Sequence, residues 1–382
     1  DGPAPWITRK NTMRDLTDDV ALMRPVIDAL RASGCDPDRV LVRVGLPPGG
    51  LPAGRFPHSA QNLFWKAAAD ECGEEHVGLH LAEHLPAFHG LLLEYLFLSS
   101  DTFGAGLRHS LRYVRLLSDT LQAQLEVEGE RAVLSLGESP AINRHFPEML
   151  AGAVIRLFGA LTEGEFKPLE VQLMNETGAP MERYRAVYGC PTILGMPRYA
   201  LVFDAAVLDK PSRHAAPELL RMHESLARRQ LAEVERLDLV RQVRELIGEL
   251  LVDGGATLEQ VAARLGMPAR RLRERLAMAG VRFNDLVTDY RCRLAKELLL
   301  KTDERIEVIV ERTGFSEPNT FYRAFKRWVG ETPGGVPPAR ASGARVGPVR
   351  KGATGSASCC RGVRGRLRPP AGSARTPSAP GR

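Results

Sequence analysis

The sequence predicts an α+β N-terminal domain, then an all-α domain with two helix-turn-helix units, and a disordered C-terminal tail. Three observations support this prediction. Residues 13–210 mix helical periodicity with the alternating pattern of strands, and residues 211–334 show helical periodicity alone. Residues 335–382 are rich in Arg, Gly, Pro, Ala and Ser and contain no aromatic residue, so they cannot bury a core.

The domain limits follow from these changes of pattern, and Pro211 marks the main boundary. The expected parts are a disordered or tag-like start (1–12), an α+β domain (13–210), a helical linker (211–238), a tandem helix-turn-helix domain (239–334) and a basic disordered tail (335–382). A length of 382 residues is more than one typical domain, which agrees with this division.

The α+β domain begins with segments of helical spacing up to about residue 120. Apolar and polar residues then alternate on both sides of Glu128-Gly129-Glu130, which predicts a β-hairpin. The segments "PLEVQLMN" (168–175) and "YALVFDAAVL" (199–208) add strands, and "EMLAGAVIRLFGALTE" (148–163) predicts a helix between the hairpin and these strands.

The first helix-turn-helix unit is "TLEQVAARLGMPARRLRERL", residues 257–276. Thr257 and Gln260 have the spacing of a capping box at a helix start, and Gly266 permits the tight turn that follows. In the second helix Leu272 and Leu276 lie one turn apart and face inward, so its other positions are outward and mainly basic.

The second unit repeats this plan between residues 306 and 328. Gly314 supplies the turn, and we expect Ser316 to cap the second helix with Pro318 in its first turn. The inward positions of the whole unit are apolar at helical spacing: Ile306, Ile309 and Val310 before the turn, and Phe315, Phe321 and Phe325 after it. Its outward positions are polar: Glu317, Asn319, Tyr322, Arg323, Lys326 and Arg327.

Charge is distributed unevenly along the chain. The segment 335–382 carries ten basic residues and no acid, residues 241–331 carry a net +3, and the residues before 241 carry −7, within a total of +6. Two ordinary helical hairpins are the alternative to two DNA-binding units. A basic second helix in both units favours a nucleic-acid partner. Two such units joined by a rigid helix could also reach successive major-groove faces, which lie ~34 Å apart on one side of the duplex.

Two stretches carry a resemblance to a known family. "GFSEPNTFYRAFKRWVGETPG" (314–334) is similar to the signature of AraC/XylS-type transcriptional regulators, and the likeness covers residues 239–334. "FLSSDTFGAGLRHSLRYVRLLSDTLQAQLEVEG" (97–129) and "YRAVYGCPTILGMPRYALVFDAAVLDKP" (184–211) resemble the arabinose-binding-type sensor domain of one branch of that family. The resemblance implies a regulator that binds double-stranded promoter DNA, senses an unidentified small molecule through its N-terminal domain, and forms a homodimer, with RNA polymerase as a further candidate partner.

The resemblance also implies which residues contact DNA. Base contacts come from the early part of each second helix: Arg270, Arg273 and Glu274 in the first unit, and Pro318, Asn319 and Arg323 in the second. Arg suits guanine, Asn suits adenine, and Glu accepts from cytosine N4. Four further residues suit phosphates, which position the protein without specifying a sequence: Arg271, Arg275, Lys326 and Arg327.

The chain departs from the family pattern at three places, of which the first is Val310, where the family usually has Ala. Thr313 replaces a residue that is usually apolar, and the residues after the "TPG" of 332–334 form the long basic tail instead of a short aromatic-Arg ending. The tail is either the product of a reading-frame change or cloning, or a nonspecific nucleic-acid arm. A constitutive, tail-driven nucleic-acid binder is therefore one alternative function.

A zinc-dependent enzyme is the other alternative. "ECGEEHVGLHLAEH" (71–84) spaces Cys72, His76, His80 and His84 four residues apart, as one stripe if the segment stays helical. Within it His80, Glu83 and His84 match the H-x-x-E-H form of a class of zinc peptidases, but a solvated His face is the commoner meaning. No other catalytic motif is present, so we expect no enzyme activity, cofactor or metal.

Cysteine usage and hydropathy bear on location. The six cysteines show no CxxC spacing and suggest no disulfide framework, no apolar run approaches the roughly 20 residues of a membrane span, and we find no secretory signal. These features predict a cytoplasmic protein. Six N-terminal side chains are candidates for a ligand pocket: His58, Trp65, His89, Tyr95, Arg112 and Tyr113.

Overall fold

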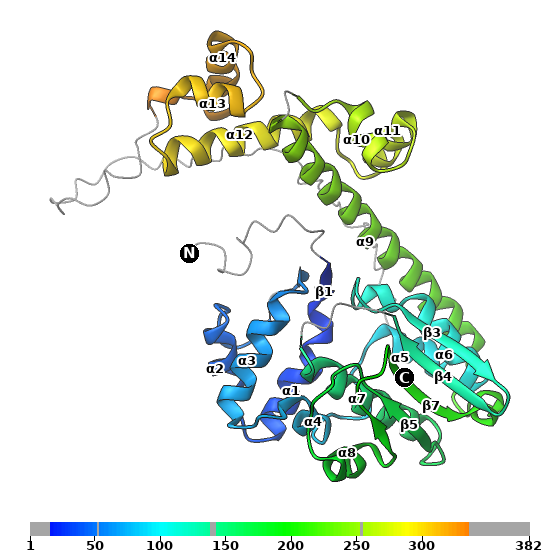
Figure 1. The fold of residues 1–382 in the computed structure, drawn as a ribbon. Coiled ribbons are helices and arrows are strands. Elements are labelled where there is room, and N and C mark those ends of the chain that lie inside the picture. The colour runs from blue at the N-terminus through cyan, green and yellow to red at the C-terminus, as the bar shows by residue number, and fades with distance from the viewer. Residues whose placement is uncertain (1–15, 52, 138–142, 253–254, 336–382) are drawn as a thin grey trace, which may run out of the picture. The chain divides into compact units, whose positions relative to one another are not determined.

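The computed structural model describes residues 16–51, 53–137, 143–252 and 255–335, whose helices and strands are drawn in Figure 1. The chain forms two compact units, Asp1–Ala232 and Glu233–Arg382. The expected start (1–12) and residues 336–382 of the expected tail lie outside the described residues. Among the described residues, no helix has the length and the apolar character needed to span a bilayer.

The N-terminal unit contains a group of short helices around one apolar core. The core includes Leu30, Leu41 and Trp65, which are fully buried. Strand β1 (Thr17–Asp19) pairs antiparallel with β2 (Arg55–Pro57) beside it. The helices around this core are α1 (Arg24–Ala32), α2 (Pro37–Arg43), α3 (Ala60–Cys72) and α4 (Val77–Ala82), whereas α5 (Leu92–Leu98) and α6 (Phe103–Arg112) bury their apolar residues in a second core.

A five-stranded sheet forms the other part of this unit, in the order β3-β4-β7-β5-β6. The strands are β3 (Ala123–Glu128), β4 (Arg131–Leu136), β5 (Pro168–Gln172), β6 (Thr192–Ile193) and β7 (Tyr199–Asp204). The β3–β4 hairpin turns at Gly129, whose φ is +61°, so the predicted hairpin is confirmed. The two further strand predictions are confirmed by β5 and β7, whereas β6 is too short for its pattern to show in the sequence.

Helices α7 (His145–Leu161) and α8 (Met181–Tyr188) complete the unit, and α7 confirms the helix predicted at 148–163. Five aromatic rings pack together where α5, α6, α7 and β7 meet, with centroids 4.9–6.3 Å apart: Phe97, Phe103, Phe158, Phe166 and Phe203. Aromatic contacts of this kind favour a rigid scaffold, because each ring buries a large apolar area in a fixed geometry.

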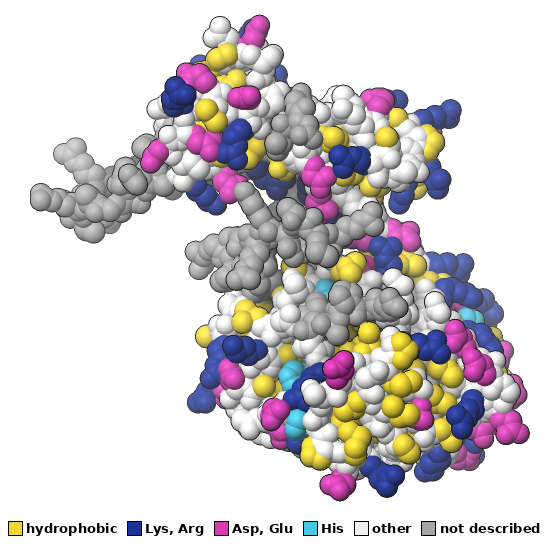
Figure 2. Space-filling model, viewed as in Figure 1, with side chains coloured by type: hydrophobic (Ala, Val, Ile, Leu, Met, Phe, Trp, Pro, Cys, Tyr) yellow, Lys and Arg dark blue, Asp and Glu magenta, His cyan; other side chains and the backbone are white. Residues whose placement is uncertain are grey.

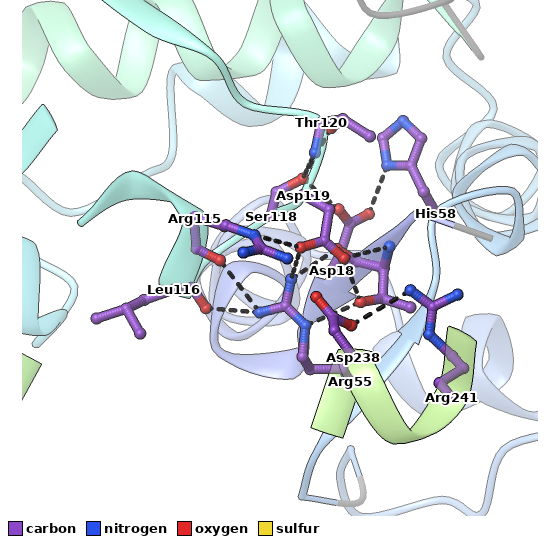
Figure 3. A network of polar contacts seen from close by, with 11 residues as sticks. Asp18, Arg55, His58, Arg115, Leu116, Ser118, Asp119, Thr120, Asp238 and Arg241 are labelled. Carbon is purple, nitrogen blue, oxygen red and sulfur yellow. Dashed lines mark hydrogen bonds and ion pairs between the residues drawn. The ribbon is translucent and has the colours of Figure 1, made fainter. Parts of the chain in front are cut away.

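A buried polar network joins β1 to the segment before β3 (Figure 3). The carboxylate of Asp18 is fully buried and accepts hydrogen bonds from Ser118 Oγ (2.5 Å), His58 Nδ1 (2.7 Å) and Gln61 Nε2 (2.5 Å). Because a buried carboxylate is costly unless it is paired, these partners fix the position of β1. His58 therefore has a structural role.

Two expectations about residues 71–84 are wrong. Helix α3 ends at Cys72, Gly73 follows with a φ of +62°, and α4 starts at Val77. The predicted His stripe on one continuous helix does not form, because Gly73 takes a left-handed conformation that ends the helix. Cys72 instead forms a disulfide with Cys35, 37 residues earlier, although the cysteine spacing suggested no disulfide.

The C-terminal unit consists of helices. Helix α9 (Pro217–Val252) contains the division between the two units, after Ala232, and the domain limits expected from the sequence stay a prediction. The following helices are α10 (Leu258–Arg264), α11 (Ala269–Met278), α12 (Phe283–Lys301), α13 (Ile306–Arg312) and α14 (Pro318–Val329).

Two apolar cores lie along α12. Leu286 and Val287, near its start, pack with residues of α9, α10 and α11, whereas Ala295 and Leu298 pack with residues of α13 and α14. Each pair of short helices therefore has its own core, and α12 joins them as one continuous helix (Figure 1). The prediction of two helix-turn-helix units separated by a longer helix is confirmed.

Candidate nucleic-acid interface

The first helix-turn-helix unit has the local structure that its sequence predicts. Thr257 Oγ1 accepts from the Gln260 amide at 3.2 Å, and Gln260 Oε1 accepts from the Thr257 amide at 3.0 Å, which forms the capping box. Gly266 has a φ of +65° at the turn, a value that residues with a Cβ rarely adopt. These features set where α10 begins and where α11 leaves it.

Helix α11 separates its side chains by face. Leu272 and Leu276 are buried. Four of the candidates for DNA contact are exposed, namely Arg270, Arg271, Arg273 and Glu274, and the fifth, Arg275, is half-buried. In Figure 2, Lys and Arg side chains gather on the surface that α11 occupies in Figure 1. The structure thus brings all five first-unit candidates onto one helix with its basic side free.

Two of these candidates contact each other. The Nε of Arg270 donates to Oε1 of Glu274 at 2.9 Å, one helical turn away, and both side chains are mostly exposed. Exposed pairs at this spacing contribute only about 0.3–0.5 kcal/mol, so the pair can separate at little cost when another partner approaches either side chain.

The turn of the second unit is held by Arg291 of α12. Its Nη2 donates to the Gly314 carbonyl at 3.2 Å, and its guanidinium lies 4.9 Å from the centre of the Phe315 ring. Burial lowers the pKa of Arg291. Arg291 lies four residues after Val287 and three before Leu294 on the inward stripe of α12, a spacing that could have identified it as a residue facing the core.

Helix α14 also buries one face and exposes the other. Phe321 and Phe325 are fully buried, which confirms them as core. The candidates of this helix are all exposed: Pro318, Asn319, Arg323, Lys326 and Arg327. Arg323 Nε donates to the Asn319 carbonyl over a long distance, 3.4 Å.

The expected cap of α14 is wrong. The residue at the N-cap is Glu317, and no side chain caps the helix there. Pro318 is the first helical residue, a position where its missing N–H and fixed φ are tolerated, and it makes Glu317 the N-cap. Ser316 lies one residue before the N-cap and is exposed.

Thr313, which replaces a usually apolar residue, is fully buried between these helices. Its hydroxyl donates to the carbonyl oxygens of Ile309 (2.7 Å) and Val310 (2.9 Å). A threonine hydroxyl that bonds back to the preceding turn is satisfied inside its own helix, so this departure fits the core.

The six pocket candidates of the N-terminal unit do not converge on one site. Trp65 is buried and donates from Nε1 to Gln61, and His58 belongs to the Asp18 network. Tyr113 is buried, while Tyr95 and Arg112 are exposed. His89 lines an apolar cavity of this unit.

The three residues of the zinc alternative lie at the C-terminal end of α4, with His80 in its last turn and Glu83 and His84 directly after it. Ligand atoms of His80, Glu83 and His84 lie within 4.8 Å of one another, and burial, followed by the nearby His84, lowers the pKa of His80. The residues H-x-x-E-H at positions 80–84 place these side chains together on any helical turn, so the cluster by itself does not indicate catalysis.

Family comparisons agree with this geometry. The family model described as "Arabinose-binding domain of AraC transcription regulator, N-term" matches residues 34–212. A second, described as "Helix-turn-helix domain", matches residues 261–336. The two matches are consecutive, and the second covers α11 and α14 with all ten candidates for DNA contact.

The chain is similar to regulators of two bacteria. It is 28% identical over 288 residues to the Ornithine utilization regulator of Pseudomonas aeruginosa, and this aligned region covers 74% of this chain and 84% of that protein. It is 30% identical over 150 residues to the HTH-type transcriptional regulator VirS of Mycobacterium tuberculosis, which covers 39% of this chain and 44% of that protein. Neither the zinc-enzyme alternative nor the tail-driven alternative finds support in these relatives.

A solved structure resembles the chain over most of its length. The transcriptional regulator CdpR from Pseudomonas aeruginosa matches with a TM-score of 0.42 and 20% identity, over 82% of this chain and 96% of that one.

Proposed function

This chain belongs to the AraC-type transcription regulators with an arabinose-binding-type N-terminal domain, and from that premise we propose how it recognises DNA. It is a DNA-binding regulator whose N-terminal domain binds a ligand. Helices α11 and α14 enter the major groove, and the contacts to bases come from Arg270, Arg273, Glu274, Pro318, Asn319 and Arg323. Phosphate contacts come from Arg271, Arg275, Lys326 and Arg327.

One observation supports this proposal above the others. Both second helices bury an apolar face of two large side chains, Leu272 with Leu276 and Phe321 with Phe325, and leave the opposite, mainly basic face exposed. A helix whose apolar face is already buried against its own unit does not need a protein partner for its basic face. Phosphates and base edges are the partners that such a face fits.

The length of α12 is consistent with both units on one DNA duplex. A helix of 19 residues is about 28 Å long at a rise of 1.5 Å per residue. Successive turns of the major groove lie ~34 Å apart on one side of the duplex. We therefore propose that the two units contact consecutive major-groove segments of one site.

We also propose that the regulator is a homodimer. Leu219, Met222 and Leu226 lie on α9 within the N-terminal unit and are exposed, Met222 to 66%. Their spacing of three and four residues places them in one stripe, which is typical of a helix that packs against another helix. A dimer would occupy two DNA sites, and RNA polymerase is a further proposed partner.

The protein acts in this proposal by binding alone, in the cytoplasm, without catalysis. The effector is a small molecule that binds one arrangement of the N-terminal domain better than another, because only such a difference shifts the equilibrium between DNA-bound states. The direction of regulation, activation or repression, depends on where the operator lies in the promoter.

The experiment maps the DNA that the full chain binds across its genome, and then compares the recovered sequence with a scrambled version in mobility-shift assays. We expect tighter binding to the recovered sequence, in the range of 10³-fold or more that specific regulators show. Deletion of residues 335–382 tests the tail, and specific binding should survive it. Equal affinity for both sequences would contradict the proposal.

A further inference from the structure

An apolar cavity of ≈ 180 Å³ lies in the N-terminal unit, between α5, α6, α7 and the hairpin strands β3 and β4. Side chains such as Phe97, Leu107, Leu134 and Leu157 line it. Only three of its lining residues have polar side chains: His89, Glu94 and Ser110. An apolar cavity with few polar groups is the usual form of a small-molecule site.

Two of these three polar side chains already make hydrogen bonds within the protein. Ser110 Oγ donates to the Leu93 carbonyl at 2.8 Å. The Glu94 carboxylate, 5% exposed, accepts from the backbone amides of His89 (2.9 and 3.1 Å) and Leu91 (3.1 Å), and from His89 Nδ1 (2.6 Å). Ser110 therefore has no hydrogen left to donate to a ligand, and the Glu94 oxygens already accept hydrogen bonds.

His89 is the exception. Its side chain is 7% exposed, and its Nε2 is buried without a hydrogen-bond partner among the residues that the structure describes. Because the Glu94 carboxylate only accepts hydrogen bonds, the ring must carry its hydrogen on Nδ1. In the neutral ring Nε2 is then an acceptor, and a buried acceptor without a partner destabilises the folded protein.

We propose that this cavity is the effector site, and that the effector is a small, mainly apolar molecule with one terminal O–H group that donates to His89 Nε2. The inference deepens the assignment of a ligand-binding N-terminal domain and rests on it. Carboxylic acids and alcohols share this chemistry. A carboxylic acid suits the site in either protonation state. The neutral acid donates its O–H to Nε2 of the neutral ring, and the carboxylate accepts from the N–H of the protonated ring, so one hydrogen lies between the same two atoms in both cases.

The volume limits the size of the ligand. A buried apolar cavity of ~150 Å³ holds one benzene molecule, so ≈ 180 Å³ holds a molecule little larger than that ring. Short aliphatic chains and single substituted rings meet this limit. Polar metabolites with several charged groups do not, since the described wall offers them few hydrogen-bonding atoms.

Calorimetric titration of the full chain tests the site with three probes of similar size: hexan-1-ol, hexanoic acid and methyl pentyl ether. The ether is an isomer of the alcohol and differs in lacking the O–H donor. We expect the alcohol or the acid to bind about tenfold more tightly than the ether, since one hydrogen bond to a buried acceptor separates them. The tighter of the two identifies the head group.

Variants assign the difference to His89. His89→Leu should remove the preference for the O–H probes and leave ether binding unchanged, whereas His89→Gln, whose amide oxygen can accept the same hydrogen, should keep part of that preference. Ala153→Leu, which fills the cavity without touching His89, should weaken all three probes. His84→Leu is the matched control, because it removes a histidine outside the cavity, and it should change none of them.

Equal binding of alcohol and ether to the unaltered chain, or the absence of binding by all three probes, would overturn the proposal. A preference for O–H probes that persists in full in His89→Leu would overturn it as well. The proposed function is measured separately, by specific DNA binding without any probe. Loss of DNA specificity with a His89-dependent preference intact would contradict the DNA contacts and support this site.

Discussion

Arg270 and Glu274 form an ion pair along the exposed face of α11, with Nε and Oε1 2.9 Å apart. Both residues are proposed to contact bases. Before DNA binds, each side chain therefore satisfies the other, and Glu274 reduces the positive charge that α11 presents to a phosphate backbone. An acidic residue on such a face lowers general affinity for DNA and increases the importance of base contacts.

Glu274→Gln should therefore strengthen DNA binding and reduce its selectivity. Removal of the negative charge strengthens attraction to any duplex, and the lost acceptor for cytosine N4 relaxes one base preference. We expect affinity for scrambled DNA to rise several-fold while affinity for the recovered site changes less. Fluorescence anisotropy at several salt concentrations measures both, and Glu259→Gln, an exposed acid on α10, is the control.

Arg323→Ala and Lys326→Ala should differ in kind, although both remove an exposed cation from α14. Arg323→Ala should cost about 1–3 kcal/mol on the recovered site and relax the preference at one base position. Lys326→Ala should weaken all sequences alike and reduce the salt dependence by about one phosphate contact. If Arg323→Ala weakened all sequences equally, its proposed base contact would be wrong.

The sequence predicted the helix-turn-helix units well because local rules determine them. Thr257 with Gln260, Gly266 and the pair Phe321 with Phe325 each depend on spacing within one or two turns, and the structure has each as predicted. The prediction that Ser316 caps α14 was wrong for an equally local reason: the helix starts at Pro318, so Glu317 is the N-cap.

Features that depend on contacts far apart in the sequence were not predictable. The free Nε2 of His89 follows from the position of Glu94, and the Cys35–Cys72 disulfide joins residues 37 apart across two helices. The four-residue spacing of the histidines would form one stripe only on a continuous helix, and Gly73 ends helix α3 before it reaches them. Periodicity describes one element at a time and does not say which elements meet.

Met222→Glu should dissociate the proposed dimer. Met222 is exposed at the centre of the stripe formed with Leu219 and Leu226, and a charge there would have to be buried in a helix–helix contact at a high cost. We expect a weakening of dimerisation by tenfold or more in sedimentation experiments. Arg221→Glu places the same acid on another face of α9 and should leave the dimer intact. A dimer that survives Met222→Glu would place the contact elsewhere.

Gly266→Ala and Gly314→Ala should destabilise the two units unequally. Both glycines have a positive φ, +65° and +72°, which costs a residue with a Cβ about 1–2 kcal/mol. A Cβ at Gly266 meets no atom within 4 Å, whereas one at Gly314 lies 2.9 Å from Leu251 Cδ2 and 3.2 Å from Arg291 Nη2. We expect Gly314→Ala to lose about 1–3 kcal/mol more, measured by hydrogen exchange in α13 and α14. Equal losses would show that Leu251 and Arg291 adjust freely.

His145 should make the N-terminal unit less stable in mild acid. Burial, with help from Arg144 and His76 and against the opposing charge of Glu75, lowers the pKa of His145 from 6.5 to about 4. Its Nδ1 is buried without a hydrogen-bond partner among the described residues, and its ring lies 6.0 Å from that of Trp65. The folded unit therefore holds a neutral imidazole.

The sign follows from proton linkage. Between pH 6.5 and about 4 the unfolded chain binds a proton at His145 that the folded unit does not, so stability is full above 6.5 and is lost as the pH falls through this window. Partial exposure reduces the effect to about 1–2 kcal/mol. His145→Phe keeps a ring beside Trp65 and removes the titration, so its unfolding midpoint in urea should fall less between neutral pH and pH ~4.5 than that of the unaltered chain. His76 and His80, whose pKa values are also lowered by burial, should leave some pH dependence in this variant. An identical fall in both proteins would show that His145 is protonated without cost in the folded unit.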